Sequence, residues 1–242
     1  MREQTYIIES FTEMADRYEG LMNSELGRFW GIKYRDFVEN VLSGVKLSNE
    51  SFFIDIATGT AFIPQLQLSK NPELKHVFGL DLTFEMLFQA KNQLLRKHTD
   101  LPVKLLCASA HEMPFRKNVF DIATCCLATH HMDAEKLLAN THASLRPGGK
   151  LFFGDVGGSA RWKIFFIRGF LRLAAFVYFL FTENLSRARA ESSAVSNVRT
   201  AGEWLELMRD AGFCNISVRE MEMNRFWIPN PVIIEAQKPK EA

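Results

Sequence analysis

Short apolar runs alternate with longer segments of helical periodicity along most of the chain. The first run, residues 52–57, ends in a turn of small residues, and a helix is predicted from about residue 61. The second run, residues 75–81, is followed by a helical pattern over 84–97. Such alternation predicts parallel strands joined by helices, arranged as a doubly wound α/β sheet.

The same alternation continues to the end of the chain. Residues 8–45 are predicted to form two helices with aromatic side chains at helical spacing. Further elements are expected as follows: strands at 103–108, 119–126 and 150–155, helices at 134–144 and 200–210, a turn at 147–149, and two closing strands around 216–222 and 232–237. In an open sheet of this kind, ligands bind beyond the carboxyl ends of the strands.

Residues 161–181 are apolar almost throughout. As a helix, this segment would hold Arg161, Arg168 and Arg172 within a narrow arc. A membrane-spanning helix needs about 20 apolar residues, and two arginines in the middle count against one. Three interpretations stay open: a helix docked on a membrane surface, a lid over a lipophilic substrate, and a helix packed on the core with its arginines outward.

Composition excludes some classes of function. The chain has 242 residues, 47% of them hydrophobic, which suits one compact domain. A formal net charge of +1 gives no general field for nucleic acid, so no such partner is expected. The start of the chain lacks an apolar signal-peptide core, and we expect a cytoplasmic protein. The four cysteines include no Cys-x-x-Cys pair, which indicates reduced thiols and no metal site.

Two acidic residues stand at the ends of the first two predicted strands. Asp55 precedes a turn whose only glycine is Gly59, and Asp81 ends the second strand. Small residues let a backbone approach a ligand closely, and a carboxylate in the second position can accept hydrogen bonds from both hydroxyls of a ribose. This βαβ unit is therefore predicted to hold a nucleoside. Capping of the strand ends is the alternative role for both acids.

Further motifs occur in a fixed order along the chain. They are Ala-Asp-Arg-Tyr-Glu-Gly-Leu-Met-Asn at 15–23, the loop 55–61, Gly-Leu-Asp at 79–81 with Met-Leu at 86–87, Met-Pro-Phe at 113–115 running to Phe-Asp at 120–121, His-His at 130–131, Leu-Arg-Pro-Gly-Gly at 145–149 and Ala-Gly-Phe at 211–213. Together they resemble class I methyltransferases that use S-adenosylmethionine (SAM), most closely the ubiquinone/menaquinone C-methyltransferase branch. Residues 158–199 show little of the resemblance.

The resemblance implies a Rossmann-like sheet of seven strands, six parallel and one antiparallel. It also implies a division of the single domain into a helical cover at 1–48, a SAM-binding core at 49–158, an apolar insertion or lid at 159–199, and a closing helix and hairpin at 200–242. The cofactor would be SAM. The implied cofactor-binding residues are Tyr18, Asp55, Ala57, Thr58, Gly59, Thr60, Asp81, Leu82, Met86, Ser109, Ala110, His111 and Leu127, with Ala128 beside the sulfonium.

Two positions depart from the family pattern. Ala61 stands where a third glycine is common, and Ser109 stands where an acid usually meets the adenine amino group. A neutral hydroxyl accepts that bond less strongly than a carboxylate, which predicts an affinity for SAM about tenfold lower.

Proton transfer has four candidates: His130, His131, Asp155 and Tyr18 of the N-terminal cover. A histidine titrates near neutral pH and can take a proton from a phenol or enol. Capping of the helix that starts near residue 133 is the alternative role for either histidine, and an acidic phenol needs little base. Arg168, Arg172 and Arg199 are candidates for substrate contact, and Arg187 and Arg189 follow the apolar segment; a solvated basic face is the alternative.

We expect an enzyme that transfers a methyl group from SAM to a small lipophilic acceptor. The first candidate for the acceptor is a prenylated quinol precursor, methylated at carbon. Two alternatives remain. One is methylation of another hydrophobic natural product or lipid, and the other is a SAM-binding subunit that docks at a membrane without turnover. Acceptor and oligomeric state are left open by the sequence.

Overall fold

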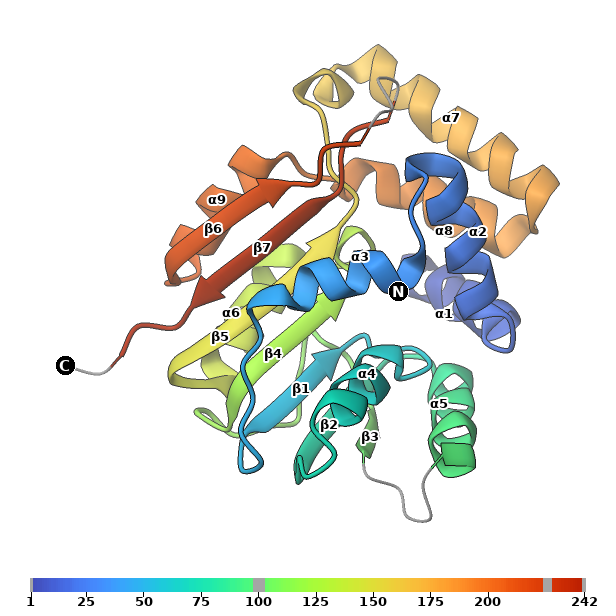
Figure 1. Cartoon of the computed structure of the whole chain (residues 1–242). Helices are drawn as coiled ribbons and strands as arrows, with labels where there is room; N and C mark the ends of the chain where they lie inside the picture. Colours follow the sequence, from blue (N-terminus) through green and yellow to red (C-terminus); the bar gives the residue numbers. More distant parts are fainter. Residues whose placement is uncertain (1, 98–102, 224–227, 241–242) are drawn as a thin grey trace.

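The computed structural model describes residues 2–97, 103–223 and 228–240, and their centre is one sheet of seven strands (Figure 1). The strands are β1 (Phe52–Ile56), β2 (His76–Asp81), β3 (Val103–Cys107), β4 (Phe120–Cys126), β5 (Leu145–Asp155), β6 (Cys214–Glu220) and β7 (Val232–Gln237). Their order is β3-β2-β1-β4-β5-β7-β6, and β7 runs antiparallel to both of its neighbours. The predicted doubly wound sheet, with six parallel strands and one antiparallel strand, is confirmed.

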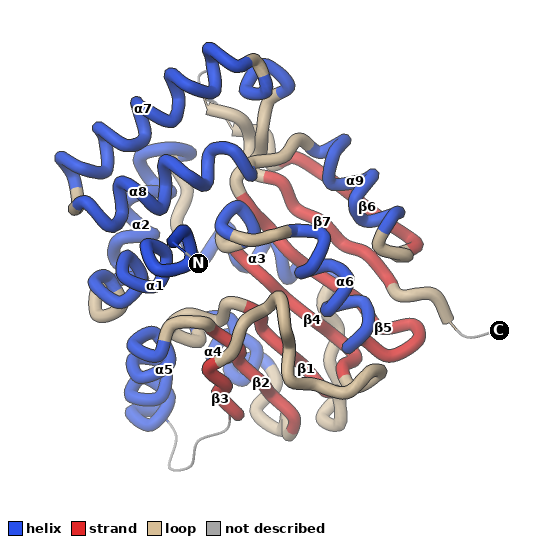
Figure 2. The backbone as a smooth tube through the Cα atoms, turned by 180° about the vertical axis from the view of Figure 1, so that it is seen from behind, coloured by secondary structure: helices blue, strands red, loops and turns tan. Residues whose placement is uncertain are grey.

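Helices cover both faces of the sheet. They are α1 (Arg2–Met14), α2 (Tyr18–Trp30), α3 (Tyr34–Val41), α4 (Phe62–Lys70), α5 (Phe84–Lys97), α6 (Ala134–Ser144), α7 (Phe165–Thr182), α8 (Leu185–Ala194) and α9 (Ala201–Asp210). Helices α3 and α4 lie on the face nearer the viewer in Figure 1, and α6 and α9 lie on the face seen from behind in Figure 2. Because side chains alternate along a strand, each face has its own apolar core: Phe53 packs on the first side and Ile54 on the second.

The N-terminal cover consists of three helices where two were predicted. The second of the two breaks between these helices falls after α2. There Gly31 adopts a left-handed conformation (φ 74°), and its amide donates to the Leu26 and Gly27 carbonyls. Glycine is the residue that ends a helix in this way at the smallest cost in strain. In β5, the predicted turn at 147–149 lies inside the strand, where Gly148 (φ 80°) interrupts the regular pairing with β4.

The apolar segment forms α7, but the helix begins four residues later than predicted. Residues 160–163 form a short 3₁₀ turn and Ile164 is extended (φ −66°, ψ 125°). Arg161 therefore lies outside the helix, and the predicted arc of three arginines keeps only Arg168 and Arg172. Helices α7 and α8 form a hairpin whose base is closed where Gly157 pairs with Arg199 (Figures 1 and 2).

Candidate functional site

The loop after β1 has an unusual backbone. Ala57, Gly59 and Ala61 all have positive φ (54°, 53° and 61°), and Ala61 is the residue that starts α4. A left-handed alanine costs roughly 1 kcal/mol, and such conformations persist where the surrounding structure fixes them. Here two hydrogen bonds fix the loop to β2: the Thr58 amide donates to the Leu80 carbonyl at 3.0 Å, and the Gly59 amide donates to the carboxylate that ends β2.

That carboxylate belongs to Asp81, which is 9% exposed. One oxygen accepts from the Gly59 amide at 2.8 Å, and the other accepts from the Thr83 amide at 2.9 Å. Burial raises the pKa of Asp81, and the amide hydrogen bonds oppose this rise. Asp81 thus holds both sides of the strand-end turn in place, and the Thr83 side chain and the Leu82 amide add further hydrogen bonds to its carboxylate.

Asp55 has a different environment. It is almost fully buried, and its carboxylate accepts a hydrogen bond from the Thr124 hydroxyl of β4 at 2.6 Å. Burial raises its pKa to about 7, against the opposing effect of the Thr124 hydrogen bond. The side chain ties β1 to β4 beneath the loop.

A cleft that encloses about 740 Å³ of empty space, open solvent at its mouth included, lies at the carboxyl ends of β1, β2 and β4. It brings together most of the residues predicted to bind a cofactor: Tyr18, Ala57, Gly59, Asp81, Leu82, Met86, Ser109, Ala110, His111 and Leu127. Asp55, Thr58 and Thr60 are not among the described residues that line it; Thr60 instead donates to Glu19 at 3.0 Å. Gln4, Ile7 and Phe11 of α1 also line the cleft, which the sequence analysis did not anticipate.

A second cavity of about 500 Å³ adjoins this cleft. Four residues line both spaces: Phe11, Tyr18, Leu127 and His131. Most of the remaining wall is apolar and comes from Met22, Leu26, Phe29, Trp30, Val156 and Phe179. The polar side chains are gathered in one corner, formed by Glu25, His130, Arg187 and Glu191 together with His131.

In that corner, His130 is oriented by Asp155. The ring nitrogen Nδ1 of His130 lies 2.6 Å from one carboxylate oxygen, and the His130 amide donates to the other at 3.0 Å. The Thr129 hydroxyl and the Val156 amide also donate to this carboxylate. Burial alone would lower the pKa of His130, but the charge and hydrogen bond of Asp155 outweigh it and the pKa is raised. Burial likewise opposes ionisation of Asp155, and the His130 charge still keeps its pKa below the ordinary range.

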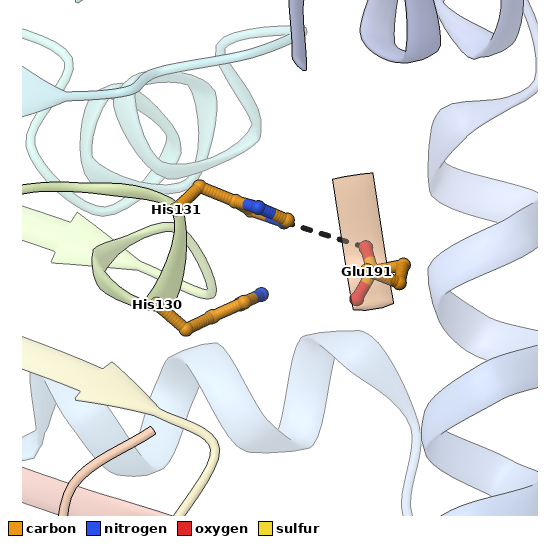
Figure 3. Close-up of side chains that lie close together, drawn as sticks. All are labelled: His130, His131 and Glu191. Atoms are coloured by element: carbon orange, nitrogen blue, oxygen red, sulfur yellow. Dashed lines mark ion pairs between the residues drawn. The ribbon is translucent and has the colours of Figure 1, made fainter. Parts of the chain in front are cut away.

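The other side of the corner is a buried charge network. In Figure 3 the rings of His130 and His131, from the turn after β4, point toward Glu191 of α8. His131 Nε2 lies 3.3 Å from a Glu191 oxygen, and the Arg187 guanidinium lies 3.1 Å from both Glu191 and Glu25. Burial raises the pKa of Glu25 to about 7 against the lowering effect of Arg187.

His130, His131 and Glu191 have the residue types of a metal site, with ligand atoms within 4.8 Å of one another. The Arg187 guanidinium lies against the same Glu191 carboxylate and supplies the positive charge that a metal ion would bring to it.

Asp155 holds the Nδ1 nitrogen of His130, so the opposite ring nitrogen, Nε2, is left for a ligand in the second cavity.

Comparisons with known proteins agree with this geometry. Residues 54–153 match the family of methyltransferase domains. The ubiquinone/menaquinone biosynthesis C-methyltransferase UbiE of Rickettsia typhi is 27% identical over 157 residues, which are 62% of this chain and 60% of that protein. The demethylmenaquinone methyltransferase of Thermotoga maritima is 25% identical over 216 residues, 88% of this chain and 90% of that protein. The chain thus spans about 60% of the length of its UbiE relative and most of the Thermotoga one.

A solved structure shows the same fold. Phosphoethanolamine N-methyltransferase 2 of Haemonchus contortus, in complex with SAM, has a TM-score of 0.67 and 17% identity over 95% of this chain and 60% of that one. The chain carries a SAM-dependent methyltransferase domain. The cofactor of this methyltransferase domain is SAM, and the left-handed loop and the Asp81 carboxylate that lines the first cleft fit a nucleoside with an amino-acid chain.

Within the methyltransferase domain, the residues predicted to contact the ribose and the adenine all line the cleft: Asp81, Leu82, Met86, Ser109, Ala110 and His111. The Ser109 hydroxyl accepts from the His111 amide at 3.1 Å, so one of its two lone pairs is already engaged.

We expect Ser109→Asp to tighten SAM binding by about tenfold, because a carboxylate accepts both the His111 amide and a ligand amino group more strongly than a hydroxyl. Titration calorimetry with SAM measures this directly. Ser109→Ala is the matched control and should weaken binding slightly. Equal affinity of the aspartate and alanine variants would show that adenine does not reach residue 109.

The three arginines predicted to contact substrate do not gather in either cavity. Arg168 and Arg172 lie on α7, outside the described lining of both spaces. Arg199 lies at the base of the hairpin, where its guanidinium stacks 5.2 Å from the Trp204 ring centre and donates to the Asn197 carbonyl. The buried guanidinium of the second cavity is Arg187, which the sequence analysis named without placing it there. Glu25 and Glu191 were not anticipated.

Proposed function

We propose that this protein transfers the methyl group of SAM to a carbon atom of a small lipophilic acceptor that carries an ionisable hydroxyl group, in the first instance a prenylated quinol precursor. The single observation that carries the proposal is the second cavity. It joins the SAM cleft through shared walls, is apolar over most of its surface, and has one polar corner. A phenol with an apolar body matches that distribution of surfaces.

Methyl transfer requires alignment, exclusion of water and removal of one proton. When bound, SAM supplies an electrophilic methyl group on a sulfonium. Leu127 and Tyr18 line both spaces. They therefore lie at the junction where the methyl group of SAM would pass to the acceptor. Burial raises the pKa of Tyr18, which keeps its hydroxyl neutral beside the sulfonium. The apolar walls keep water from the reacting carbon.

His130 is the proposed general base. Its Nδ1 is held by Asp155, so the opposite nitrogen Nε2 carries the lone pair that takes the hydroxyl proton of the acceptor. The resulting phenolate places electron density on the ring carbon next to it, and this carbon takes the methyl group as the methyl–sulfur bond breaks. The same carbon then loses its hydrogen as a proton while the oxygen regains one, so the aromatic ring is restored with a net loss of one proton. Arg187, 4% exposed in the same corner, offsets the negative charge of Glu25 and Glu191, with which it pairs, and so lowers their repulsion of the anion.

The names of the relatives support this acceptor class. Both the Rickettsia typhi and the Thermotoga maritima proteins are named for quinone methylation, at 27% and 25% identity. The second cavity is bounded by Phe29, Trp30 and Phe179, whose rings suit an isoprenoid chain.

An acceptor series tests the proposal. Purified protein is incubated with SAM carrying a labelled methyl group and with three acceptors: a demethylated quinol with a short isoprenoid chain, the same quinol without the chain, and its O-methylated ether. We expect carbon methylation of the first, a higher KM for the second and no product from the ether, because the ether cannot ionise. Equal turnover of ether and quinol would contradict a role for hydroxyl ionisation.

A further inference from the structure

Among the residues that the structure describes, large exposed apolar side chains gather on α7. Phe166 and Phe181 are 82% and 83% exposed, and the other exposed members are Phe165, Phe170, Leu173, Val177 and Leu180. In both Figure 1 and Figure 2, α7 is the outermost helix at one end of the molecule, with α8 and α2 on its inner side. Contiguous exposed apolar surface on this scale marks an interaction site.

The exposed side of α7 is apolar over a wide arc. At about 100° per residue, Phe166, Leu173 and Val177 fall near the middle of this arc, with Phe170 and Leu180 beside them. Arg168 and Arg172 form a basic flank that projects roughly 160° and 120° from the centre of this arc, on the same side of the helix as the buried Phe179. The helix is therefore amphipathic, but its apolar side faces solvent, whereas the apolar side of a surface helix normally packs on the core.

The packed side of α7 is tied to the rest of the domain. Arg28 of α2 bonds to the Tyr178 hydroxyl, and the rings of Tyr178 and Phe29 lie 5.8 Å apart. Phe179 is 8% exposed under the Arg187 guanidinium, and Glu183 pairs with Arg17 at 2.8 Å. By length and by its mean hydropathy of 1.6, α7 could cross a bilayer, but these contacts hold it flat against the domain.

Charge distinguishes between the possible partners of this surface. Between Asp155 and Glu183 the sequence contains four basic residues and no acidic one. Lys163 pairs with Glu203, whereas in the described part of the chain neither Arg168 nor Arg172 has an ion-pair partner. A second copy seated on the same surface would bring like charges together. Anionic lipid headgroups would meet the basic flank while the apolar arc enters the acyl region.

We propose that α7 docks this protein, parallel to the bilayer plane, on a membrane that contains anionic phospholipid. Phe166, Phe170, Leu173 and Val177 enter the interface, and the stems of Arg168 and Arg172 extend to the headgroups. The inner side of the same helix contributes Phe179 to the second cavity. Docking would bring the second cavity close to the acyl region of the bilayer, where a lipophilic acceptor dissolves. This last step rests on the proposed function.

The test is sedimentation of the full chain with vesicles of phosphatidylcholine mixed with phosphatidylglycerol, and with phosphatidylcholine alone. We expect binding to the mixed vesicles that weakens with salt. The double variant Phe166→Ser/Phe170→Ser should lower the partition coefficient by at least about thirtyfold, since two phenylalanine side chains leave the interface. Arg168→Glu/Arg172→Glu should lower it by more than about tenfold.

Matched controls are available elsewhere on the surface. Phe84 and Phe88 of α5 are 63% and 52% exposed at the same spacing, so Phe84→Ser/Phe88→Ser makes the same substitutions at exposed phenylalanines, with somewhat less exposed surface than the 82% and 69% of Phe166 and Phe170. Arg116→Glu/Lys117→Glu changes net charge by the same amount on an exposed loop. Both controls should bind vesicles as the parent does, and all four variants should bind SAM unchanged, which separates this test from that of the proposed function.

Three outcomes would overturn the inference. One is equal binding of the α7 variants and their controls. Another is absence of vesicle binding by the parent. The third is a concentration-dependent dimer in sedimentation velocity that Phe166→Ser/Phe170→Ser abolishes, which would assign α7 to contact between copies of this chain.

Discussion

Replacing Asp81 with alanine is expected to weaken SAM binding by at least about 100-fold. Asp81 lines the cleft, and a carboxylate can accept a hydrogen bond from each of the two hydroxyls of a ribose. A hydrogen bond to a charged group contributes about 1.5–3 kcal/mol, so the loss of two exceeds the roughly 2.8 kcal/mol that corresponds to 100-fold. The loop also loses the bond from the Gly59 amide. Titration calorimetry with SAM and with its demethylated product measures the change.

Asp121→Ala is the matched control for this experiment. Asp121 also accepts a backbone amide, that of Phe52 at 2.8 Å, and pairs with Arg146 at 2.8 Å. It lies near the opposite end of β4 from the cleft. Its removal should lower the melting temperature without changing SAM affinity. Parent-like affinity in Asp81→Ala would place the ribose elsewhere, and failure of the parent to bind either ligand would leave a methyltransferase fold that has lost its cofactor.

Elements whose boundaries are set by local signals could be predicted from the sequence. Helices α5 and α6 and strand β7 have the predicted limits. For α6, the Asp133 side chain caps the first turn by accepting from the Lys136 amide, a signal present in the sequence itself. The start of α7 was misplaced because a 3₁₀ turn at 160–163 and the extended Ile164 precede the helix, and no glycine or proline marks that position.

The SAM cleft could be predicted from local sequence signals, whereas the polar corner of the second cavity could not. Asp81 and the loop of Gly59 are next to strand ends, so a short motif places them at the cleft. The acceptor corner depends on α8, which brings Arg187 and Glu191 to His130 across more than fifty residues of sequence. No periodicity or spacing encodes that approach, because it depends on how the hairpin of α7 and α8 packs on α1 and α2.

Replacing His130 with glutamine is expected to lower kcat for methyl transfer by about 10²- to 10⁴-fold, the range for loss of a positioned general base. Glutamine can keep a hydrogen bond to Asp155, so the fold should be retained. The affinity for SAM should stay unchanged, because His130 is not among the described residues that line the first cleft. His76→Gln, at the far end of β2, is the matched control and should retain full activity.

The pH dependence of kcat/KM separates a base from a residue that only fills space. His130 acts unprotonated, so activity should fall as pH decreases through its pKa. Burial favours a lower pKa, but Asp155 outweighs it and places the ascending limb above the ordinary histidine value of about 6.5. In Asp155→Asn, burial remains and the opposing charge is gone. The limb should therefore move to lower pH while the maximum rate falls, whereas an unmoved limb would show that another group accepts the proton.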